Sequence, residues 1–159
     1  MDIHVRPAVE GDIAAMAELI NEIIAIGGTT AHKTPFTPKR MRDHYFAPAC
    51  GISCFVATSG DAIVGFQALE RCDPEWDGAG RLPADWATVA SFVRAGLQGG
   101  GVGGKLFAAT KAAARDAGIT AIDATIRLEN TGGRTFYGKM GFVDYRVDDQ
   151  VVSKRFDVA

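Results

Sequence analysis

The residues best suited to chemistry form a glycine cluster in the second half of the chain. Five of the nine residues from Gln98 to Leu106 are glycine, between a segment that predicts a strand and one that predicts a helix. Bare backbone can approach an anion closely, and the first N–H groups of a helix point at it with the positive end of the helix dipole behind them. Glycine in a helix costs up to about 1 kcal/mol relative to alanine, so a flexible turn without a ligand is a weak explanation. The cluster predicts a phosphate-binding loop.

Two well-known phosphate motifs overlap this cluster, and neither fits its setting. Gly99 to Gly104 matches the dinucleotide fingerprint G-x-G-x-x-G, with Asp123 as the ribose-binding acid. That fingerprint normally follows the first strand of its fold, whereas here most of the chain precedes it. Gly99 to Lys105 also matches G-x-x-x-x-G-K of a P-loop, but Leu106 lacks the hydroxyl that would bind Mg²⁺.

A third pattern, Gln98-x-x-Gly101-x-Gly103, resembles the Gln/Arg-x-x-Gly-x-Gly/Ala signature of the GCN5-related N-acetyltransferase (GNAT) family. Asn130 with Tyr137, in the segment Phe136-Tyr137-Gly138-Lys139-Met140-Gly141-Phe142, resembles the second signature of that family. The resemblance extends over most of the chain, because the hairpin ending in residues 62–66 also looks like the second and third strands of the family. Two motifs in the right order are far more specific than either alone.

The resemblance implies that acetyl-CoA is the acyl donor and that the glycine cluster holds its diphosphate. A strand with an open edge can pair with the amides of the pantetheine arm. The residues that the resemblance assigns to the coenzyme are Ser91, Phe92, Val93, Gln98, Gly99, Gly100, Gly101, Val102, Gly103, Gly104, Asn130 and Tyr137. Lys105 would add a cation or be a solvated lysine, and Asn130 also suits a helix cap or a turn.

Acetyl transfer to an amine requires a neutral amine, a stabilised carbonyl oxygen and a proton for the leaving thiolate. Tyr137 is the expected general acid, since a phenol of pKa about 10 can protonate a thiolate whose conjugate acid lies near 8.5; the alternative is a tyrosine that merely caps the core. The chain looks most like the phosphinothricin and amino-acid acetyltransferases, which usually carry a glutamate in the central strand. Residues 87–90 contain no acid, so Glu70 is the candidate base, directly or through water, with a surface ion pair as its alternative.

The acceptor is expected to lie against the irregular segments. Phe36 and Tyr45 represent residues 27–46, and Trp76 represents the loop of residues 73–85. That loop carries four acids (Asp73, Glu75, Asp77 and Asp85) against Arg81, which favours a cationic amine or is simply a solvated acidic loop. The histidines and cysteines lack the spacing of a metal site, so we predict no metal.

Periodicity predicts a mixed α/β sheet in the order β-α-α-β-β-β-α-β-α-β-β, which is also the order of the GNAT fold. Strands are expected at 3–7, 52–57, 62–71, 86–93 and 119–128, with two more in 142–156. Helices are expected from Asp12, which would cap the first, to Gly27; from Thr37, the cap of the second, to about Phe46; from 102 to Gly118; and over 134–139. No repeat or linker divides the chain, so we expect one domain over residues 1–159.

Composition excludes several classes of protein. The chain is 47% hydrophobic and 23% charged, with a net charge of −2, which is typical of a globular domain and unlike a basic nucleic-acid binder. No apolar run is long enough to span a membrane, and the N-terminal residues do not resemble a secretory signal. Three cysteines are too few for a disulfide framework, which favours a reducing cytoplasm.

We therefore expect an acetyl-CoA-dependent N-acetyltransferase that transfers its acetyl group directly, in a ternary complex, to a primary amine of a small molecule such as an amino acid, an amino-acid analogue or a polyamine. The alternatives are a protein or peptide N-acetyltransferase and a non-catalytic acyl-CoA-binding regulatory domain. A homodimer is expected from the resemblance, and no nucleic acid or membrane is expected as a partner.

Overall fold

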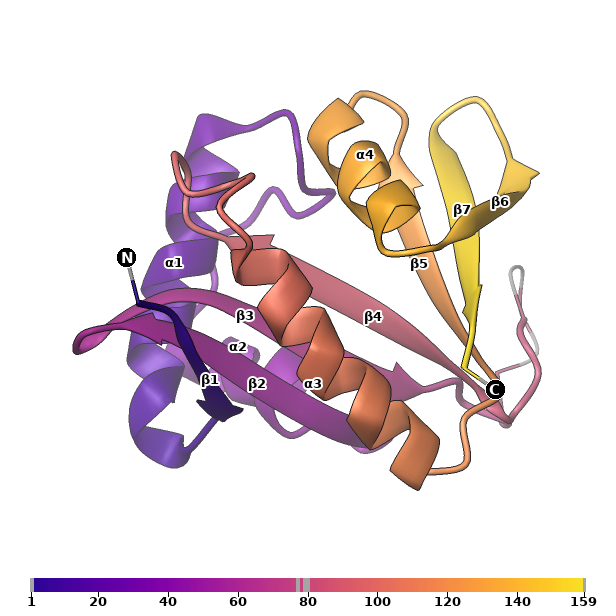
Figure 1. Cartoon of the computed structure of the whole chain (residues 1–159), viewed down its shortest axis with the longest axis horizontal. Helices are drawn as coiled ribbons and strands as arrows, with labels where there is room; N and C mark the ends of the chain where they lie inside the picture. Colours follow the sequence, from indigo (N-terminus) through magenta and orange to yellow (C-terminus); the bar gives the residue numbers. More distant parts are fainter. Residues whose placement is uncertain (1, 77, 79–80, 159) are drawn as a thin grey trace.

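A single seven-stranded sheet organises the chain, as the computed structural model of residues 2–76, 78 and 81–158 shows (Figure 1). Its strand order is β1-β2-β3-β4-β5-β7-β6. The strands are β1 (His4–Pro7), β2 (Gly51–Ser59), β3 (Ala62–Arg71), β4 (Trp86–Val93), β5 (Ala121–Arg127), β6 (Val143–Val147) and β7 (Val151–Asp157). The α-helices are α1 (Ile13–Ile26), α2 (Pro38–Met41), α3 (Val102–Asp116) and α4 (Thr131–Lys139). The expected order of elements and the mixed α/β class are confirmed.

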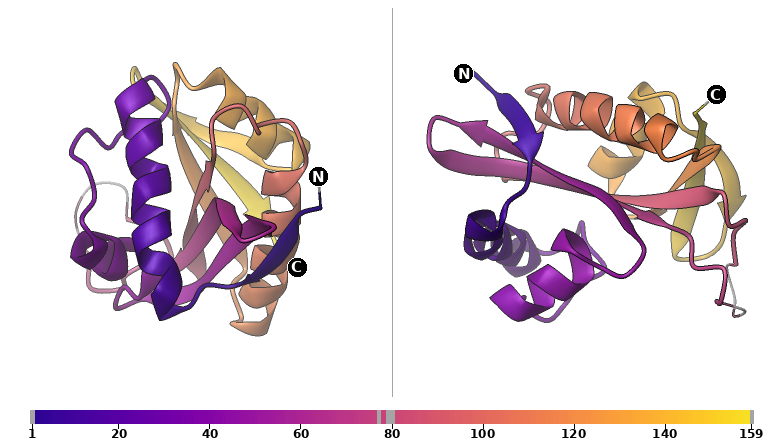
Figure 2. Two further views of the ribbon diagram at one scale, coloured as in Figure 1. Left: turned by 90° about the vertical axis from the view of Figure 1, so that its left-hand side faces the viewer. Right: turned by 90° about the horizontal axis from the view of Figure 1, so that it is seen from below.

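Helices cover the two faces of the sheet, with α1 and α2 on one side and α3 and α4 on the other (Figure 2). Alternation along β3 and β4 divides their side chains between these layers. Phe66 packs with Met16, Leu19 and Met41 on the α1–α2 side, whereas Leu69 packs with Phe107 on the α3–α4 side. The sheet is thus buried on both faces near its centre, where the functional residues must be held.

All neighbouring strands are antiparallel except β4 and β5, which are parallel and joined through α3. Their pairing covers only Trp86 with Ala121, Ala87 with Ile122 and Thr88 with Asp123. Beyond Thr88 the two strands diverge, and the gap between them widens toward the N-terminal end of α3 and toward α4 (Figure 1). The sheet is therefore split on one side, and residues 89–93 of β4 have no strand partner there.

Helix ends follow the sequence signals with two exceptions. Gly27, with φ of 78°, ends α1, and the Thr37 hydroxyl accepts a hydrogen bond from the Arg40 N–H (3.1 Å) at the start of α2, as expected. Asp12 does precede α1, but its carboxylate makes no cap bond to that helix, because it accepts the Val9 N–H (2.8 Å) and pairs with Arg6 (2.7 Å). The last expected helix was too short, since α4 begins at Thr131 rather than at residue 134.

The second helix changes its pitch where it meets the sheet. After four α-helical residues the chain continues as a π-helical turn over Arg42–Phe46. A π turn is rare and shifts the facing of the residues that it contains, and such turns often occur at functional sites. Here it carries His44 and Tyr45, which both reach the cavity described below.

Replacing Thr37 with alanine tests how much the N-cap of α2 contributes to stability. Loss of the N-cap bond to Arg40 is expected to lower the free energy of unfolding by about 1 kcal/mol. Thr37→Ser keeps the hydroxyl and is the matched control. Urea denaturation of the three proteins measures the difference, and equal stability of the alanine and serine variants would contradict the assigned cap.

Candidate active site

The split between β4 and β5 exposes backbone groups that could pair with an extended ligand. The Arg94 N–H bonds to the Val64 carbonyl and the Cys72 N–H to the Trp86 carbonyl (both 2.9 Å), so alternate residues of β4, Phe92 among them, turn their backbone toward β3. The backbone of Ser91 and Val93 then faces the split. Phe92 instead points its ring into the α1–α2 layer, 5.4 Å from the ring of Tyr45.

The signature residues Gln98, Gly101 and Gly103 each have a structural task in the glycine loop. Gln98 donates to the Val93 carbonyl (3.2 Å) and accepts the Gly96 N–H (2.9 Å), which ties the loop to the end of β4. Gly101 precedes α3 with φ of 87°, a backbone conformation that residues with a Cβ atom rarely adopt. A Cβ at Gly103 would lie 2.6 Å from the Phe136 ring, so glycine there lets α4 pack against α3.

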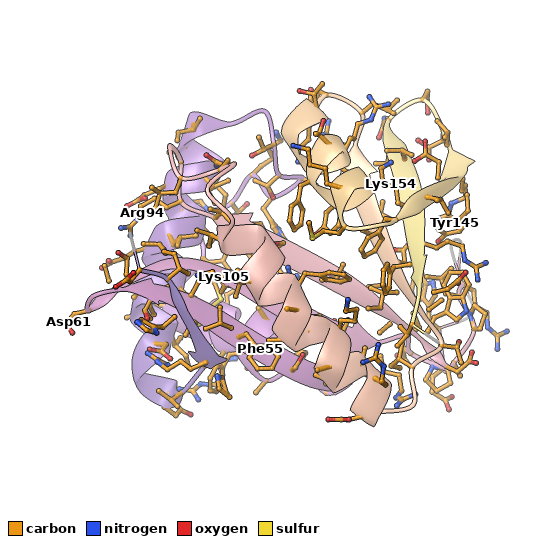
Figure 3. All side chains as sticks on the ribbon, in the orientation of Figure 1. Phe55, Asp61, Arg94, Lys105, Tyr145 and Lys154 are labelled. Atoms are coloured by element: carbon orange, nitrogen blue, oxygen red, sulfur yellow. The ribbon has the colours of Figure 1, made fainter. Side chains whose placement is uncertain are left out.

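The N-terminus of α3 is prepared for an anion. Its cap residue, Gly101, offers no side chain, and the first turn of the helix contains no acidic residue. The leading N–H groups and the positive end of this 15-residue helix are therefore not compensated by a carboxylate of the helix's own first turn. Lys105 is directed elsewhere, since its ammonium lies 3.4 Å from the Ile3 carbonyl, on the β1 side of the helix (Figure 3).

Tyr137 projects from α4 into the layer between α4 and the sheet. Its side chain is only 7% exposed and packs between Phe136 and Phe142, with ring centroids 4.9 and 5.1 Å away. Burial, and then the charges of Asp123 and Tyr45, raise the pKa of its hydroxyl. Within the described part of the chain this hydroxyl has no hydrogen-bond partner, so it is protonated and free to donate a hydrogen bond to a ligand.

A cavity of about 210 Å³ lies on the α1–α2 side, where β4 loses its partner. Its lining comes from the π turn, β3 and β4: His44, Tyr45, Pro48, Ala68, Leu69, Glu70, Thr88, Val89 and Ala90. Glu70 is the one acid of this lining, and the lining contains no lysine or arginine. Burial, and then the charge of Asp73, raise the pKa of Glu70. No ion pair of Glu70 occurs among the described residues, so its carboxylate remains available to a ligand.

The chain also matches a known family by sequence. The family model described as the acetyltransferase (GNAT) domain matches residues 51–144, which contain the hairpin, the split strands, the glycine loop and Tyr137. The chain belongs to the GNAT acetyltransferase family. It is an N-acetyltransferase, and acetyl-CoA is its acyl donor.

Solved structures extend the likeness in fold over nearly the whole chain. A candidate phosphinothricin N-acetyltransferase superposes with a TM-score of 0.79 at 19% identity, covering 99% of both chains. The protein yncA from Salmonella typhimurium, solved with its cofactor acetyl-CoA, superposes with a TM-score of 0.78 at 16% identity, over 99% of this chain and 94% of that one. A ribosomal-protein-alanine N-acetyltransferase from Brucella melitensis gives 0.76 at 18%, over 97% and 99%. No curated protein matches by sequence.

Asn130 of the second GNAT signature makes hydrogen bonds to segments on both sides of the split. The Asn130 amide oxygen accepts the Gly133 N–H (2.9 Å) and so caps α4, which is the alternative that the sequence left open. Its amide nitrogen donates to the Thr29 carbonyl (3.1 Å), which ties the loop after α1 to α4. Asn130 therefore holds the loop that leads from α1 to the cavity.

Of the three expected acceptor residues, only Tyr45 belongs to the lining of the cavity. Tyr45 lines the cavity, but Phe36 is 4% exposed and lies behind it, stacked on Tyr45 at 5.8 Å and fixed by backbone bonds to Asn21 (2.7 and 3.0 Å). Trp76 is 55% exposed and belongs to the loop between β3 and β4. That loop lies at the other end of β4 from the glycine loop (Figure 1). Asp77, one of the four acids expected to attract the amine, lies outside the described residues.

Asp123 is a buried carboxylate whose setting the sequence did not indicate. It stands on β5 at the last residue paired with β4, is 5% exposed, and accepts hydrogen bonds from Tyr145 (2.6 Å) and Thr125 (3.0 Å). Figure 3 shows Tyr145 on the outer strands of the sheet. Burial raises the pKa of Asp123, and both hydrogen bonds oppose that rise. The alternation of β5 predicted a polar residue here, but the sequence contains no signal for Tyr145 as its partner.

Neither a metal centre nor a membrane span is found where the structure can be described. Residues 2–76, 78 and 81–158 contain no group of three or more histidine, cysteine, aspartate or glutamate side chains placed to share an ion. None of the helices in these ranges combines the length and apolarity that crossing a bilayer requires.

The glycine loop gives a direct test of coenzyme binding. Gly101→Asp places a side chain and a negative charge before α3, and we expect the Kd for coenzyme A to rise at least tenfold, about 1.4 kcal/mol. Gly60→Asp is the matched control, because Gly60 also has positive φ (59°) but lies in the turn between β2 and β3. Calorimetric titration with coenzyme A measures both, and equal Kd values for the two variants would contradict the assignment.

Proposed function

We propose that this GNAT enzyme acetylates the primary amine of a small molecule held in the 210 Å³ cavity beside Thr88 and Ala90. The cavity is the observation that carries the proposal: its volume is small, it meets the split in the sheet, and Glu70 is its one acid. A lining with a carboxylate and without lysine or arginine favours a cationic amine. The reaction that fits is direct transfer in a ternary complex.

The proposed coenzyme site consists of the glycine loop with the N-terminus of α3, and of the edge of β4 that has no strand partner. We assign its diphosphate to the backbone of Gly99–Gly104, and its arm to the outward backbone groups of Ser91 and Val93. Three further residues support this site. Gln98 anchors the glycine loop to β4, Asn130 caps α4, and Phe92 packs beside Tyr45. Bound acetyl-CoA supplies the acetyl group and a thiol leaving group. Backbone donors aimed from β4 could stabilise the carbonyl oxygen.

Tyr137 is the proposed general acid. Its raised pKa keeps the phenol protonated throughout the physiological range, and its hydroxyl proton is not committed to another group in the described chain. The tyrosine approaches from the α4 side of the split, whereas the cavity lies on the α1–α2 side. This arrangement supports a mechanism in which the proton donor and the amine approach the reacting bond from opposite sides.

Glu70 is the proposed partner of the acceptor amine. Its carboxylate attracts the ammonium form and can take a proton from it, directly or through a water molecule. Glu70 lies on β3 in register with Thr88, the first residue of the cavity on β4. In this proposal Glu70 on β3 takes the place of the glutamate that the phosphinothricin-type enzymes usually carry on the central strand, which is β4 here.

The other acceptor class is a peptide or protein amine. The Brucella neighbour is named for a ribosomal protein, and that name supports this second candidate. A peptide would need an open groove rather than a cavity of this size, which favours the small molecule. We also propose that residues 1–159 form one domain, that the enzyme works in the cytoplasm, and that it is a homodimer.

Turnover on a panel of amines tests the proposed function. Thiol release from acetyl-CoA should be accelerated by small primary amines with one cationic group, and not by peptides with free N-termini or lysines. Tight coenzyme binding without amine-dependent release would instead support a regulatory acyl-CoA-binding domain. Modification of peptides, seen by mass spectrometry with labelled acetyl-CoA, would support the protein acceptor.

Tyr137→Phe should lower kcat by at least tenfold and leave the Kd for acetyl-CoA unchanged, because the ring stays and only the proton donor is lost. Since the pKa of Tyr137 is raised, the wild-type rate should show no loss from ionisation of this residue up to about pH 10. Steady-state rates across pH measure this. A wild-type rate in the variant at every pH would leave Tyr137 a packing residue.

Glu70→Gln should raise KM for the amine and lower kcat, because the negative charge of the cavity is removed. A base must be deprotonated, so the wild-type rate should fall as pH drops through the pKa of Glu70, which lies above its ordinary value of 4.5. The variant should lack this acid limb. Glu18→Gln, on an exposed turn of α1, makes the same charge change and is the control. An acid limb preserved in the Glu70 variant would assign it to another group.

A further inference from the structure

One hydrogen-bonded pair in the cavity wall has no task in the reaction described above. The Tyr45 hydroxyl lies 2.6 Å from Nε2 of His32, which belongs to the loop between α1 and α2. Tyr45 lines the cavity beside Glu70, whereas His32 is partly exposed and does not belong to the cavity lining. A phenol at the cavity and a partly exposed imidazole hydrogen-bonded to it form a chain of two groups that leads outward.

Acetyl transfer to an amine that binds as an ammonium ion releases protons that such a route can carry. An ammonium nitrogen has three N–H bonds and the amide product has one, so two protons leave the nitrogen. One proton equivalent ends on the thiol of coenzyme A, and the other is released to solution. Glu70 can accept one of the two protons, which leaves a second acceptor to be found in the cavity wall.

We propose that Tyr45 and His32 act as a proton-accepting pair for the acceptor amine; the inference rests on the proposed acetylation of a small amine in this cavity. As the proton passes from the nitrogen to the Tyr45 oxygen, the N–H bond breaks and a new O–H bond forms. The original Tyr45 proton moves to His32 Nε2, which becomes an imidazolium cation. That cation releases its proton to solvent, and the pair returns to its starting state.

The surroundings of His32 suit an acceptor. The charged and titratable groups around it are Arg40, His44 and Tyr45, and Phe36 contacts its ring edge-on at 4.9 Å. Burial, and then the charges of His44 and Arg40, lower the pKa of His32, so the imidazole is neutral near pH 7 and has a lone pair to offer. Burial raises the pKa of Tyr45, which keeps its proton in place until the amine donates one.

The pair is also held rigidly. The backbone N–H of His32 donates a hydrogen bond to the Thr30 hydroxyl (3.2 Å). The neighbouring Thr29 carbonyl accepts a hydrogen bond from the side chain of Asn130, before α4. On the other side, Phe36 is fixed to Asn21 and stacks on Tyr45. His44 contacts Tyr45 at 4.4 Å between ring centroids, but its ring nitrogens make no hydrogen bond to any described residue. The geometry therefore selects His32 rather than His44 as the partner of Tyr45.

Three variants test the pair on an amine that the wild-type enzyme acetylates. Tyr45→Phe keeps the ring, and His32→Gln keeps a hydrogen-bond acceptor but cannot take a proton. Each should lower kcat about 100-fold, and the double variant should lose no more than either alone, because the groups act as a unit. His4→Gln, on β1, is the control. Losses that multiply in the double variant, or a wild-type kcat and pH profile in His32→Gln, would overturn the pair.

A second measurement needs no turnover. The ¹⁵N chemical shifts of His32 in the free enzyme should report the neutral tautomer with the proton on Nδ1, and a pKa below 6.5 that changes in Tyr45→Phe. A proton on Nε2 of the neutral ring would mean that Tyr45 is the acceptor and would overturn the proposal. If the wild type acetylates no small amine, the proposed function fails, and the tautomer still decides whether the pair is built as described.

Discussion

The loss of pairing between β4 and β5 after Thr88 is the constraint on which the site depends. A continuous parallel sheet would satisfy the backbone of residues 89–93 internally and would leave no passage between its two faces. Because the strands separate, the backbone of β4 is available to a ligand, and groups from the two helical layers meet through the gap. Tyr137 reaches it from α4, and Tyr45 and Glu70 approach from the α1–α2 side.

The glycine loop and the helix packing depend on the same split. Gln98 fixes the loop to the last residue of β4, Gly101 allows the turn into α3, and Gly103 admits Phe136 of α4 against α3. The packing of α4 in turn sets where Tyr137 stands, since Phe136 and Tyr137 are consecutive. A motif whose backbone is suited to an anion therefore also positions a side chain of α4, through direct contact between α3 and α4 at Gly103 and Phe136.

Much of this arrangement could be predicted from the sequence, and the exceptions have physical causes. Alternation and helical spacing are local, and they placed the strands, the glycine stop at Gly27 and the cap at Thr37. The start of α4 was missed because Gly132 and Gly133 hide a helix that begins only when Asn130 caps it. Three-dimensional partners leave no local trace: nothing in the spacing of Tyr45 and His32, or of Asp123 and Tyr145, indicates that they touch. Trp76 was expected near Phe36 and Tyr45 because all lie in irregular segments, but of the three only Tyr45 belongs to the lining of the cavity.

Burial is the largest cause of the resting protonation states of the site. Removing solvent disfavours the charged form of every group, so it raises the pKa of Tyr45, Tyr137 and Glu70 and lowers that of His32 and His44. The tyrosines are then protonated and the histidines neutral at the same pH, which places proton donors and proton acceptors together before any ligand arrives. A more open site would keep these groups nearer their ordinary pKa values, and histidine would be protonated over more of the working range. The burial that would limit the size of an acceptor in the proposed site also favours the neutral forms of its side chains, so cavity size and protonation state are physically linked.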